Sequence, residues 1–209
     1  MSGREERQMK IALIGATGNV GRRVTAEAVS RGHEVVAIAR DVSGLPEQGG
    51  VTAVRADLTD KEAIGKAIQG ADAVVLSVKF QELDVEALLD ALKDAKRLLI
   101  VGGAASLYVA PGLQLIDTEG FPDFIKVEAE PARQALARIQ QEQDLDWTFL
   151  SPSVFFGPGE RTGNFRLGKD DLLSDADGKS HISYEDYAIA LLDEIEQPKH
   201  SRQRFTVGY

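Results

Sequence analysis

The stretch that decides the fold is "MKIALIGATGNVG", residues 9–21, near the beginning of the 209-residue chain. In it the apolar run "IALI" is followed at once by three glycines, Gly15, Gly18 and Gly21. From the second of these glycines on, residues 18–31 carry apolar side chains at helical spacing. The pattern predicts a strand, a glycine-rich turn and a helix in direct succession.

A turn of this kind has a known use in dinucleotide-binding folds. There the first strand-to-helix turn directs backbone N–H groups and the positive end of the helix at a pyrophosphate. Gly15 is expected to make the sharp turn, Gly18 to let phosphate oxygens approach the backbone, and Gly21 to let the helix lie close to the sheet. The spacing G-x-x-G-x-x-G departs from the standard G-x-G-x-x-G, so an ordinary glycine turn is the alternative.

Further strands are predicted from short apolar runs along the rest of the chain. The runs are residues 33–40, 51–55, 72–78, 97–103, 147–150 and the stretch "RFTVG" near the end. Segments with apolar residues at helical spacing separate most of them. Because parallel neighbours need crossover connections, this alternation predicts an α/β fold: a Rossmann-type, doubly wound, mostly parallel sheet with helices on both faces, in a single domain.

Local signals place some of the helix ends. Thr59 followed by Glu62 forms a capping box, and Ser183 followed by Asp186 resembles another. Pro131 is expected to start a new helical segment or to kink an existing one, because it has no N–H to donate. The domain is predicted to cover residues 9–209, and the charged opening "MSGREERQ", residues 1–8, to be a flexible leader without the apolar centre of a secretory signal.

The composition narrows the classes of function. A net charge of −9 opposes a broad nucleic-acid footprint, and no apolar run approaches the ~20 residues of a membrane span. The chain has no cysteine, which fits a reducing cytoplasm, and its three histidines are too far apart in sequence to suggest a metal site. We expect a small-molecule ligand, with neither nucleic acid nor membrane as a partner; the sequence does not indicate an oligomeric state.

One arginine bears on the choice of cofactor. Sites for NAD commonly place an acidic residue about 20 positions after the glycines, where it binds the ribose hydroxyls. Here Arg40 ends the second predicted strand, and a guanidinium there is suited to a 2′-phosphate, although Asp41 stands next to it. This predicts that NADP(H) is preferred, with NAD(H) as the alternative. Arg22 and Arg23 are other candidates for the phosphate.

The stretches "IALIGATGNVG", "EVVAIARDVSGLP", "RADLTD", "DAVVLSV", "SPSVFFGPGERTG" and "ISYEDYA" carry a family resemblance. They resemble the atypical, NmrA-like branch of the short-chain dehydrogenase/reductase superfamily, and within it most closely the NAD(P)H-flavin reductase, or biliverdin reductase B-like, group. The resemblance implies a Rossmann fold and a nicotinamide cofactor. The cofactor-binding positions it implies are Gly15, Thr17, Gly18, Asn19, Val20, Gly21, Arg40, Asp57, Leu58, Ser77 and Val78.

One residue pair that the wider superfamily uses for catalysis is missing from this sequence. Relatives with alcohol or epimerase chemistry use a tyrosine four residues before a lysine as their proton donor. Lys126 has Pro122 four residues earlier, and none of the four tyrosines precedes a lysine at that spacing. The pattern therefore favours hydride transfer to a flavin such as FMN or riboflavin, because stacking and orientation supply most of the catalysis and solvent supplies the proton.

On the substrate side, the resemblance implies roles for Ser106 and Ser153 as candidate catalytic residues and places the substrate-side wall mainly in residues 151–183. Arg161 and Arg166 in that segment offer a positive patch for a flavin phosphate, with a solvated loop as the alternative. Two other functions stay open. One is an NmrA-like redox sensor that binds NAD(P) without turnover, and the other is an epimerase- or dehydratase-like enzyme with a displaced acid.

Overall fold

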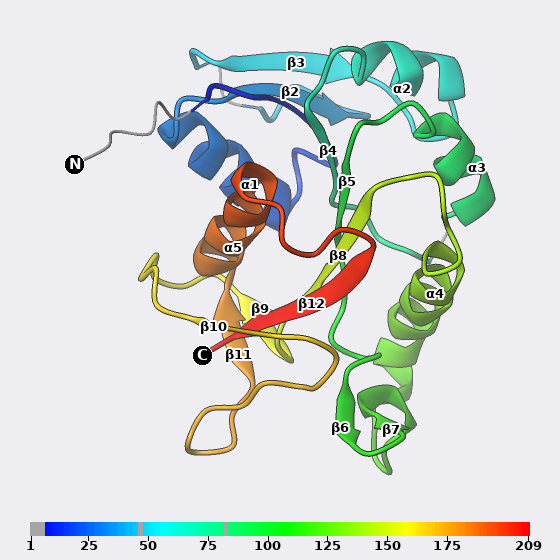
Figure 1. The fold of residues 1–209 in the computed structure, drawn as a ribbon, viewed down its shortest axis with the longest axis vertical. Helices are drawn as coiled ribbons and strands as arrows, with labels where there is room; N and C mark the ends of the chain where they lie inside the picture. The colour runs from blue at the N-terminus through cyan, green and yellow to red at the C-terminus, as the bar shows by residue number, and fades with distance from the viewer. Residues whose placement is uncertain (1–6, 46–47, 82) are drawn as a thin grey trace.

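The structure contains the strand, turn and helix predicted at the beginning of the chain, drawn in blue in Figure 1. The strand belongs to an eight-stranded sheet. The computed structural model describes residues 7–45, 48–81 and 83–209. In it β1 covers Lys10–Ile14 and α1 covers Asn19–Ser30. The other strands of this sheet are β2 (Glu34–Ala39), β3 (Val51–Arg55), β4 (Ala73–Leu76), β5 (Leu98–Val101), β8 (Trp147–Ser151), β10 (Arg166–Gly168) and β12 (Gln203–Gly208).

The remaining elements lie around this sheet. The other helices are α2 (Lys61–Ala67), α3 (Val85–Ala91), the 3-10 turn η1 (Leu115–Asp117), α4 (Asp123–Ile139) and α5 (Tyr184–Glu196). Two small sheets complete the fold, one from β6 (Tyr108–Ala110) and β7 (Leu113–Gln114), the other from β9 (Phe155–Gly157) and β11 (His181–Ser183).

The strand order confirms the predicted Rossmann-type topology. The strands run β3-β2-β1-β4-β5-β8-β12-β10, and every neighbouring pair is parallel except β10 with β12. The chain moves outward from β1 in one direction through β2 and β3, and in the other direction from β4 onward. Such a reversal leaves a crevice at the carboxyl ends of β1 and β4, where ligands of doubly wound folds bind.

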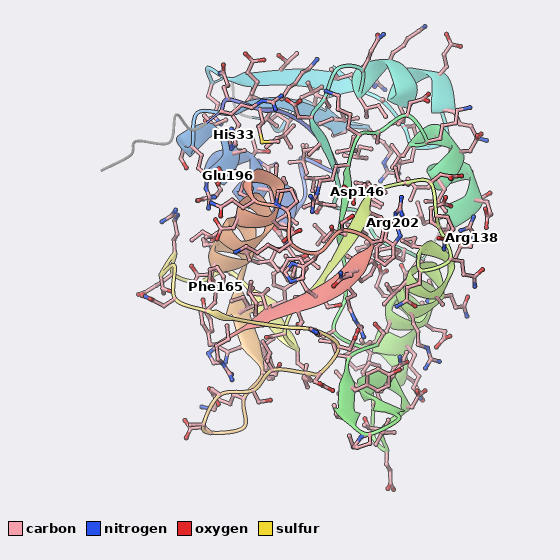
Figure 2. All side chains as sticks on the ribbon, viewed as in Figure 1. His33, Arg138, Asp146, Phe165, Glu196 and Arg202 are labelled. Atoms are coloured by element: carbon pink, nitrogen blue, oxygen red, sulfur yellow. The ribbon has the colours of Figure 1, made fainter. Side chains whose placement is uncertain are left out.

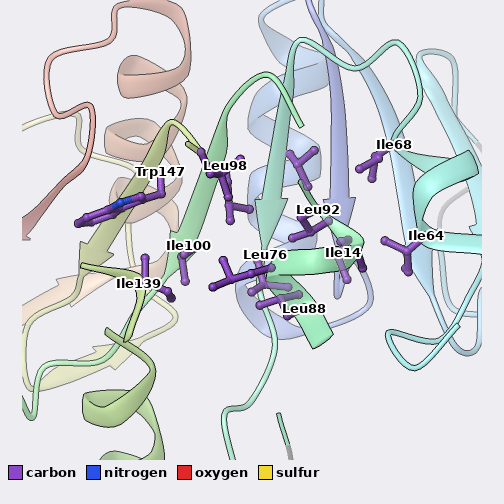
Figure 3. Packing of buried hydrophobic residues seen from close by; sticks show 14 of the residues in the cluster. Ile14, Ile64, Ile68, Leu76, Leu88, Leu92, Leu98, Ile100, Ile139 and Trp147 are labelled. Carbon is purple, nitrogen blue, oxygen red and sulfur yellow. The ribbon is translucent and has the colours of Figure 1, made fainter. Parts of the chain in front are cut away.

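Helices cover both faces of the sheet. In Figure 1, α1 and α5 lie on one side, and α2, α3 and α4 lie on the other. Leu76 and Ile100 of the central strands pack toward the second group, together with Ile139 of α4, as Figure 3 shows. Leu13 and Leu99 belong to the cluster on the other face. Two covered faces explain why the strands are continuous apolar runs, and each buried leucine or isoleucine contributes about 1.5–3 kcal/mol.

One helix end differs from the prediction, and the structure excludes one of the two effects predicted for Pro131. Asp60, not Thr59, caps α2, because its carboxylate accepts the hydrogen bond of the Ala63 N–H at 2.9 Å. Thr59 donates its hydroxyl to Asp57 instead. Pro131 lies inside the continuous helix α4 and does not start a new segment.

The second predicted cap is confirmed. The Ser183 hydroxyl accepts the hydrogen bond of the Asp186 N–H at 2.9 Å, at the beginning of α5. Of the expected leader, residues 1–6 lie outside the described residues. Within the described part of the chain, no helix combines the length and the apolar character that crossing a bilayer requires.

Charged side chains connect α1 and the residues after it to α5 and to the loop before β10. Nε2 of His33 lies 2.9 Å from a carboxylate oxygen of Glu196, and Figure 2 shows the two side by side. Glu27 of α1 is buried and accepts hydrogen bonds from Arg31 at 2.9 Å and twice from Arg161 at 2.8 Å. The network ties the loop before β10 to the first helix.

Candidate functional site

The three glycines of the first turn differ in how strongly the surrounding structure requires a residue without a side chain. Gly15 has a φ of +87°, and a Cβ there would lie 2.0 Å from the Ser77 carbonyl oxygen at the end of β4. A Cβ at Gly21 would lie 2.3 Å from the Gly15 carbonyl oxygen. A Cβ at Gly18 would meet the Gly15 oxygen at 3.3 Å and no other atom within 4 Å outside its chain neighbours. The protein's own packing thus requires Gly15 and Gly21, whereas a Cβ at Gly18 would meet only that one oxygen, at a close 3.3 Å, and otherwise open space on the turn.

The open space lies at the amino end of α1. Gly18 occupies the N-cap position without a side-chain cap, and the first turn of the helix contains no acidic residue. The N–H groups of the first helical turn have no partner within the helix, and they carry the positive end of its dipole. This end of α1 is therefore suited to a bound anion.

One cavity, the strand-end cavity, extends from this turn over the carboxyl ends of β1, β2 and β3. Its volume is about 580 Å³. Most of the predicted cofactor-binding residues line it, namely Gly15, Thr17, Gly18, Arg40, Asp57, Leu58, Ser77 and Val78. They come from four separate segments, so the fold brings together what the sequence had placed at four strand ends.

Arg40 is the cationic group at the β2 end of the strand-end cavity. It is exposed, and its guanidinium forms no ion pair or hydrogen bond with any residue that the structure describes. Asp57 lies across the cavity in a turn where one carboxylate oxygen accepts hydrogen bonds from the N–H and the hydroxyl of Thr59, at 2.9 and 2.8 Å. These hydrogen bonds, the backbone one first, lower the pKa of Asp57 below its ordinary value, and the charge of Arg40 adds to the effect.

The two other arginines considered for a phosphate have partners within the protein. Arg22 donates hydrogen bonds to the carbonyls of Thr17 and Gly44, at 2.9 and 2.7 Å. Arg23 pairs with Glu185 at 3.0 Å. Arg40 is thus the one of these three arginines whose guanidinium has no partner among the described residues and can bind a ligand.

A second cavity, the apolar cavity, adjoins the first and has a volume of about 590 Å³. Gly18, Ser77, Val78 and Lys79 line both. Asn19 and Val20 of the predicted set line only this one, and Gly21 lines neither. Its walls come from residues 101–106 after β5, from η1, α4 and the segment before it, from residues 149–156, and from Tyr184. From residues 151–183, the segment expected to form most of the substrate-side wall, Pro152, Ser153, Val154 and Phe156 line this cavity.

The lining of the apolar cavity is mainly apolar, with the charged residues Lys79, Glu128 and Arg133 and several uncharged polar residues among its walls. Ser153 lines it, but its hydroxyl donates a hydrogen bond to the Val207 carbonyl at 3.0 Å. Ser106, 6% exposed, lines it as well. Glu128 of α4 accepts the hydrogen bond of the Phe80 N–H at 2.8 Å, which links the loop after β4 to α4.

The expected positive patch of Arg161 and Arg166 does not form. Arg161 is paired with Glu27, and Arg166 donates hydrogen bonds to the carbonyls of Ser174 and Tyr209. Neither arginine lines the apolar cavity. Both guanidiniums are used to hold loops in place.

Of the four tyrosines, Tyr184 at the start of α5 lines the apolar cavity. Its ring contacts the Phe156 ring edge to face, with centroids 4.6 Å apart. Tyr187 is fully buried and donates its hydroxyl to the Leu150 carbonyl at 2.7 Å, and burial raises its pKa well above the ordinary value. Among the described residues, no three His, Asp or Glu side chains gather into a possible metal site.

Some residues that line the two cavities were not predicted from the sequence. Lys79 lines both cavities directly after Ser77 and Val78, so its position at the end of the fourth strand was a usable signal. Glu128 sits on a helix among other charged residues. No local pattern distinguishes it from its exposed neighbours.

Comparisons with known proteins place this site in context. The model of a family described as NAD(P)H-binding matches residues 15–198. The uncharacterised protein YwnB of Bacillus subtilis is 46% identical over 211 aligned residues, which cover 95% of this chain and 98% of that protein.

Two solved structures are similar over nearly their whole length. A "putative epimerase" from Bacteroides thetaiotaomicron is 39% identical with a TM-score of 0.92, covering 97% of this chain and 98% of that one. A "putative NADH-flavin reductase" from Streptococcus pneumoniae is 34% identical with a TM-score of 0.86, covering 96% of this chain and 99% of that one.

Proposed function

The chain belongs to the NAD(P)H-binding family, and on that premise we propose that it is a reductase that transfers hydride from NADPH to a flavin or a flavin-like small molecule. One observation carries the proposal. Two cavities of similar volume, one ending at an uncommitted arginine and the other apolar, share Gly18 of the glycine turn and residues 77–79 at the β4 end. This is the layout that a dinucleotide needs if its two halves are to lie on either side of its pyrophosphate.

In this proposal each half of the cofactor has its own residues. The pyrophosphate lies on the turn at Gly18, against the amino end of α1. The adenosine half lies in the strand-end cavity between Asp57 and Arg40, whose guanidinium binds the 2′-phosphate. The nicotinamide half passes Ser77 and Val78 into the apolar cavity.

The apolar cavity also suits a flat acceptor. Its volume is within the range of small-molecule sites, and Phe149, Phe156 and Tyr184 supply aromatic surface. When bound, NADPH supplies the hydride. The chain's residues hold the two rings together and exclude water, and this orientation is the main source of the rate. Solvent supplies the proton that completes the reduction.

Two observations are compatible with functions other than flavin reduction. The cavity that binds the cofactor is equally compatible with a sensor that does not turn over. Tyr184 in the apolar cavity, together with the likeness to the Bacteroides thetaiotaomicron protein, supports an epimerase-like enzyme as the second candidate.

Anaerobic mixing of the protein with NADPH and either FMN or riboflavin tests the proposal. We expect the flavin absorbance to bleach in step with NADPH oxidation, at a rate that saturates with each substrate. Tight NADPH binding without oxidation by either flavin would refute the reductase and favour the sensor. Tyr184→Phe serves as the second arm, because a flavin reductase tolerates loss of this hydroxyl and an enzyme that uses it as an acid does not.

A further inference from the structure

Arg204 is a buried charged residue of the last strand. It lies on β12, and its side chain is 3% exposed. Its Nε and Nη2 both lie 2.8 Å from Oδ1 of Asp170, a carboxylate that is 52% exposed. The ion pair is therefore asymmetric, with the guanidinium on the inside and the carboxylate at the surface.

The inner end of this guanidinium contacts a residue of the apolar cavity. Nη1 of Arg204 donates a hydrogen bond to Oγ of Ser106 at 3.0 Å, across 98 positions of sequence. Ser106 lines the cavity just after β5. Among the described residues Arg204 is its side-chain partner, and no hydrogen bond given by the Ser106 hydroxyl proton is found.

This arrangement decides how the serine can act. A hydroxyl has one proton to donate and two lone pairs to accept with, whereas a guanidinium can only donate. Arg204 occupies a lone pair of Oγ, so the proton of Ser106 is left for a ligand in the cavity. The buried positive charge also polarises the O–H bond, which strengthens the hydrogen bond that the serine can give.

We propose that Arg204, fixed by Asp170, is a positioning residue that holds the Ser106 hydroxyl as a hydrogen-bond donor toward the acceptor ring during hydride transfer. The inference rests on the proposed function. In the step itself, the C4–H bond of the reduced nicotinamide breaks and its hydride forms a bond to the acceptor, so NADPH is oxidised and the acceptor ring gains negative charge. Ser106 stabilises this charge and keeps its own proton, and water supplies the proton that neutralises the ring.

In this way the Arg204 and Ser106 pair fills part of the gap left by the missing tyrosine and lysine. It provides a donor beside a positive charge without a proton transfer from the protein. A flavin ring, whose carbonyls carry the developing charge, can use such a donor. A substrate that must receive a proton from the enzyme cannot.

The test is a double-mutant cycle on the flavin reductase assay, with Ser106→Ala, Arg204→Met, Arg204→Lys and the double variant of the first two. We expect kcat at saturating NADPH to fall by about 10-fold or more in Ser106→Ala and in Arg204→Met, the size of a charge-assisted hydrogen bond. The KM for the flavin is expected to change by less than about twofold, because the contact to the flavin strengthens in the transition state. Arg204→Lys keeps the charge and restores part of the rate.

The cycle separates positioning from structural support. Because Arg204 acts through Ser106, adding Arg204→Met to Ser106→Ala is expected to cause no further fall in kcat. A double variant whose losses multiply would overturn the inference, since Arg204 would then act independently of the serine. Arg202→Met is the matched control, because it removes an exposed arginine just before the same strand, at a residue that does not line the cavity.

Folding and function are controlled separately. Thermal unfolding and NADPH titration show whether each variant is folded and binds cofactor; if Arg204→Met unfolds, unchanged kcat in Ser106→Ala and in Arg204→Lys would still overturn the inference. A wild-type protein that reduces no flavin would refute the proposed function and this inference together. An active wild type with unaffected variants would refute this inference alone.

Discussion

Replacing Arg40 by alanine is expected to weaken NADPH binding and to leave NADH binding nearly unchanged. The two dinucleotides differ only at the 2′-phosphate, and Arg40 is the cation that lines the strand-end cavity at the end of β2. Its guanidinium has no partner among the described residues, so its loss removes a contact to the ligand and no hydrogen bond or ion pair that the described protein makes.

The size of the effect follows from the exposure of this side chain. A hydrogen bond to a charged group contributes about 1.5–3 kcal/mol. Arg40 is exposed, so solvent and salt screen its charge, and the lower part of that range applies. A loss of about 1.5–2 kcal/mol corresponds to a dissociation constant for NADPH raised by about 10- to 30-fold.

Calorimetric titration of both dinucleotides into wild type and Arg40→Ala measures this difference. Arg138→Ala is the control, because Arg138 is a half-exposed arginine of α4 that pairs with Glu86 and lines neither cavity, as Figure 2 locates it. An equal loss for NADPH and NADH, or no loss for NADPH, would refute the assignment of Arg40 to the 2′-phosphate. The difference is also expected to shrink at high salt.

Four further substitutions test the site and its support. Gly18→Ala is expected to lower the melting temperature far less than Gly21→Ala and to weaken NADPH and NADH alike by calorimetry, because its Cβ meets one carbonyl oxygen of the protein at 3.3 Å but would also meet the pyrophosphate. Gly21→Ala is expected to lower the melting temperature because its Cβ clashes with backbone, whereas Gly65→Ala, in open space on α2, is expected to raise stability by about 0.5–1 kcal/mol. Hydrogen bonds from Arg161 outweigh burial and lower the pKa of Glu27 in the folded protein. The ionised carboxylate therefore stabilises the fold fully at a pH above the pKa of glutamate in the unfolded chain, near 4.3. This stabilisation decreases as the pH falls below that pKa. Urea unfolding of Glu27→Gln should therefore show a loss of about 1.5–3 kcal/mol at neutral pH that shrinks in acid, and a loss independent of pH would contradict the assignment.

The sheet could be predicted from the sequence because its central strands are covered on both faces. A strand such as β2, predicted as residues 33–40 and observed as Glu34–Ala39, is a continuous apolar run that few other structures explain. The edge strand β10 and the small β6–β7 sheet were missed. They have two or three residues each and are largely exposed, so no apolar pattern distinguishes them from loops.

The grouping of the candidate cofactor-binding residues in one cavity could be predicted for a similar reason. These residues follow the predicted strands directly, and parallel strands bring their carboxyl ends to one edge. The substrate side depends on partners that are distant in sequence. Arg161 was expected to bind an anion, but its carboxylate partner Glu27 lies 134 positions away, and no local pattern reports such a pair. Arg204 and Ser106 are separated by 98 positions in the same way.

The difference between a sensor and a reductase therefore has to be sought in the apolar cavity, because the strand-end cavity serves both equally. A protein that only reports on the cofactor needs no second cavity beside the first. This chain has an adjoining apolar cavity of about 590 Å³, with aromatic walls and a serine whose hydroxyl accepts a hydrogen bond from a buried arginine. Leaving that space open costs the packing that larger side chains would provide, and an arginine buried behind it costs desolvation. Both costs are reasonable if a second ring binds beside the cofactor, and this favours a reductase.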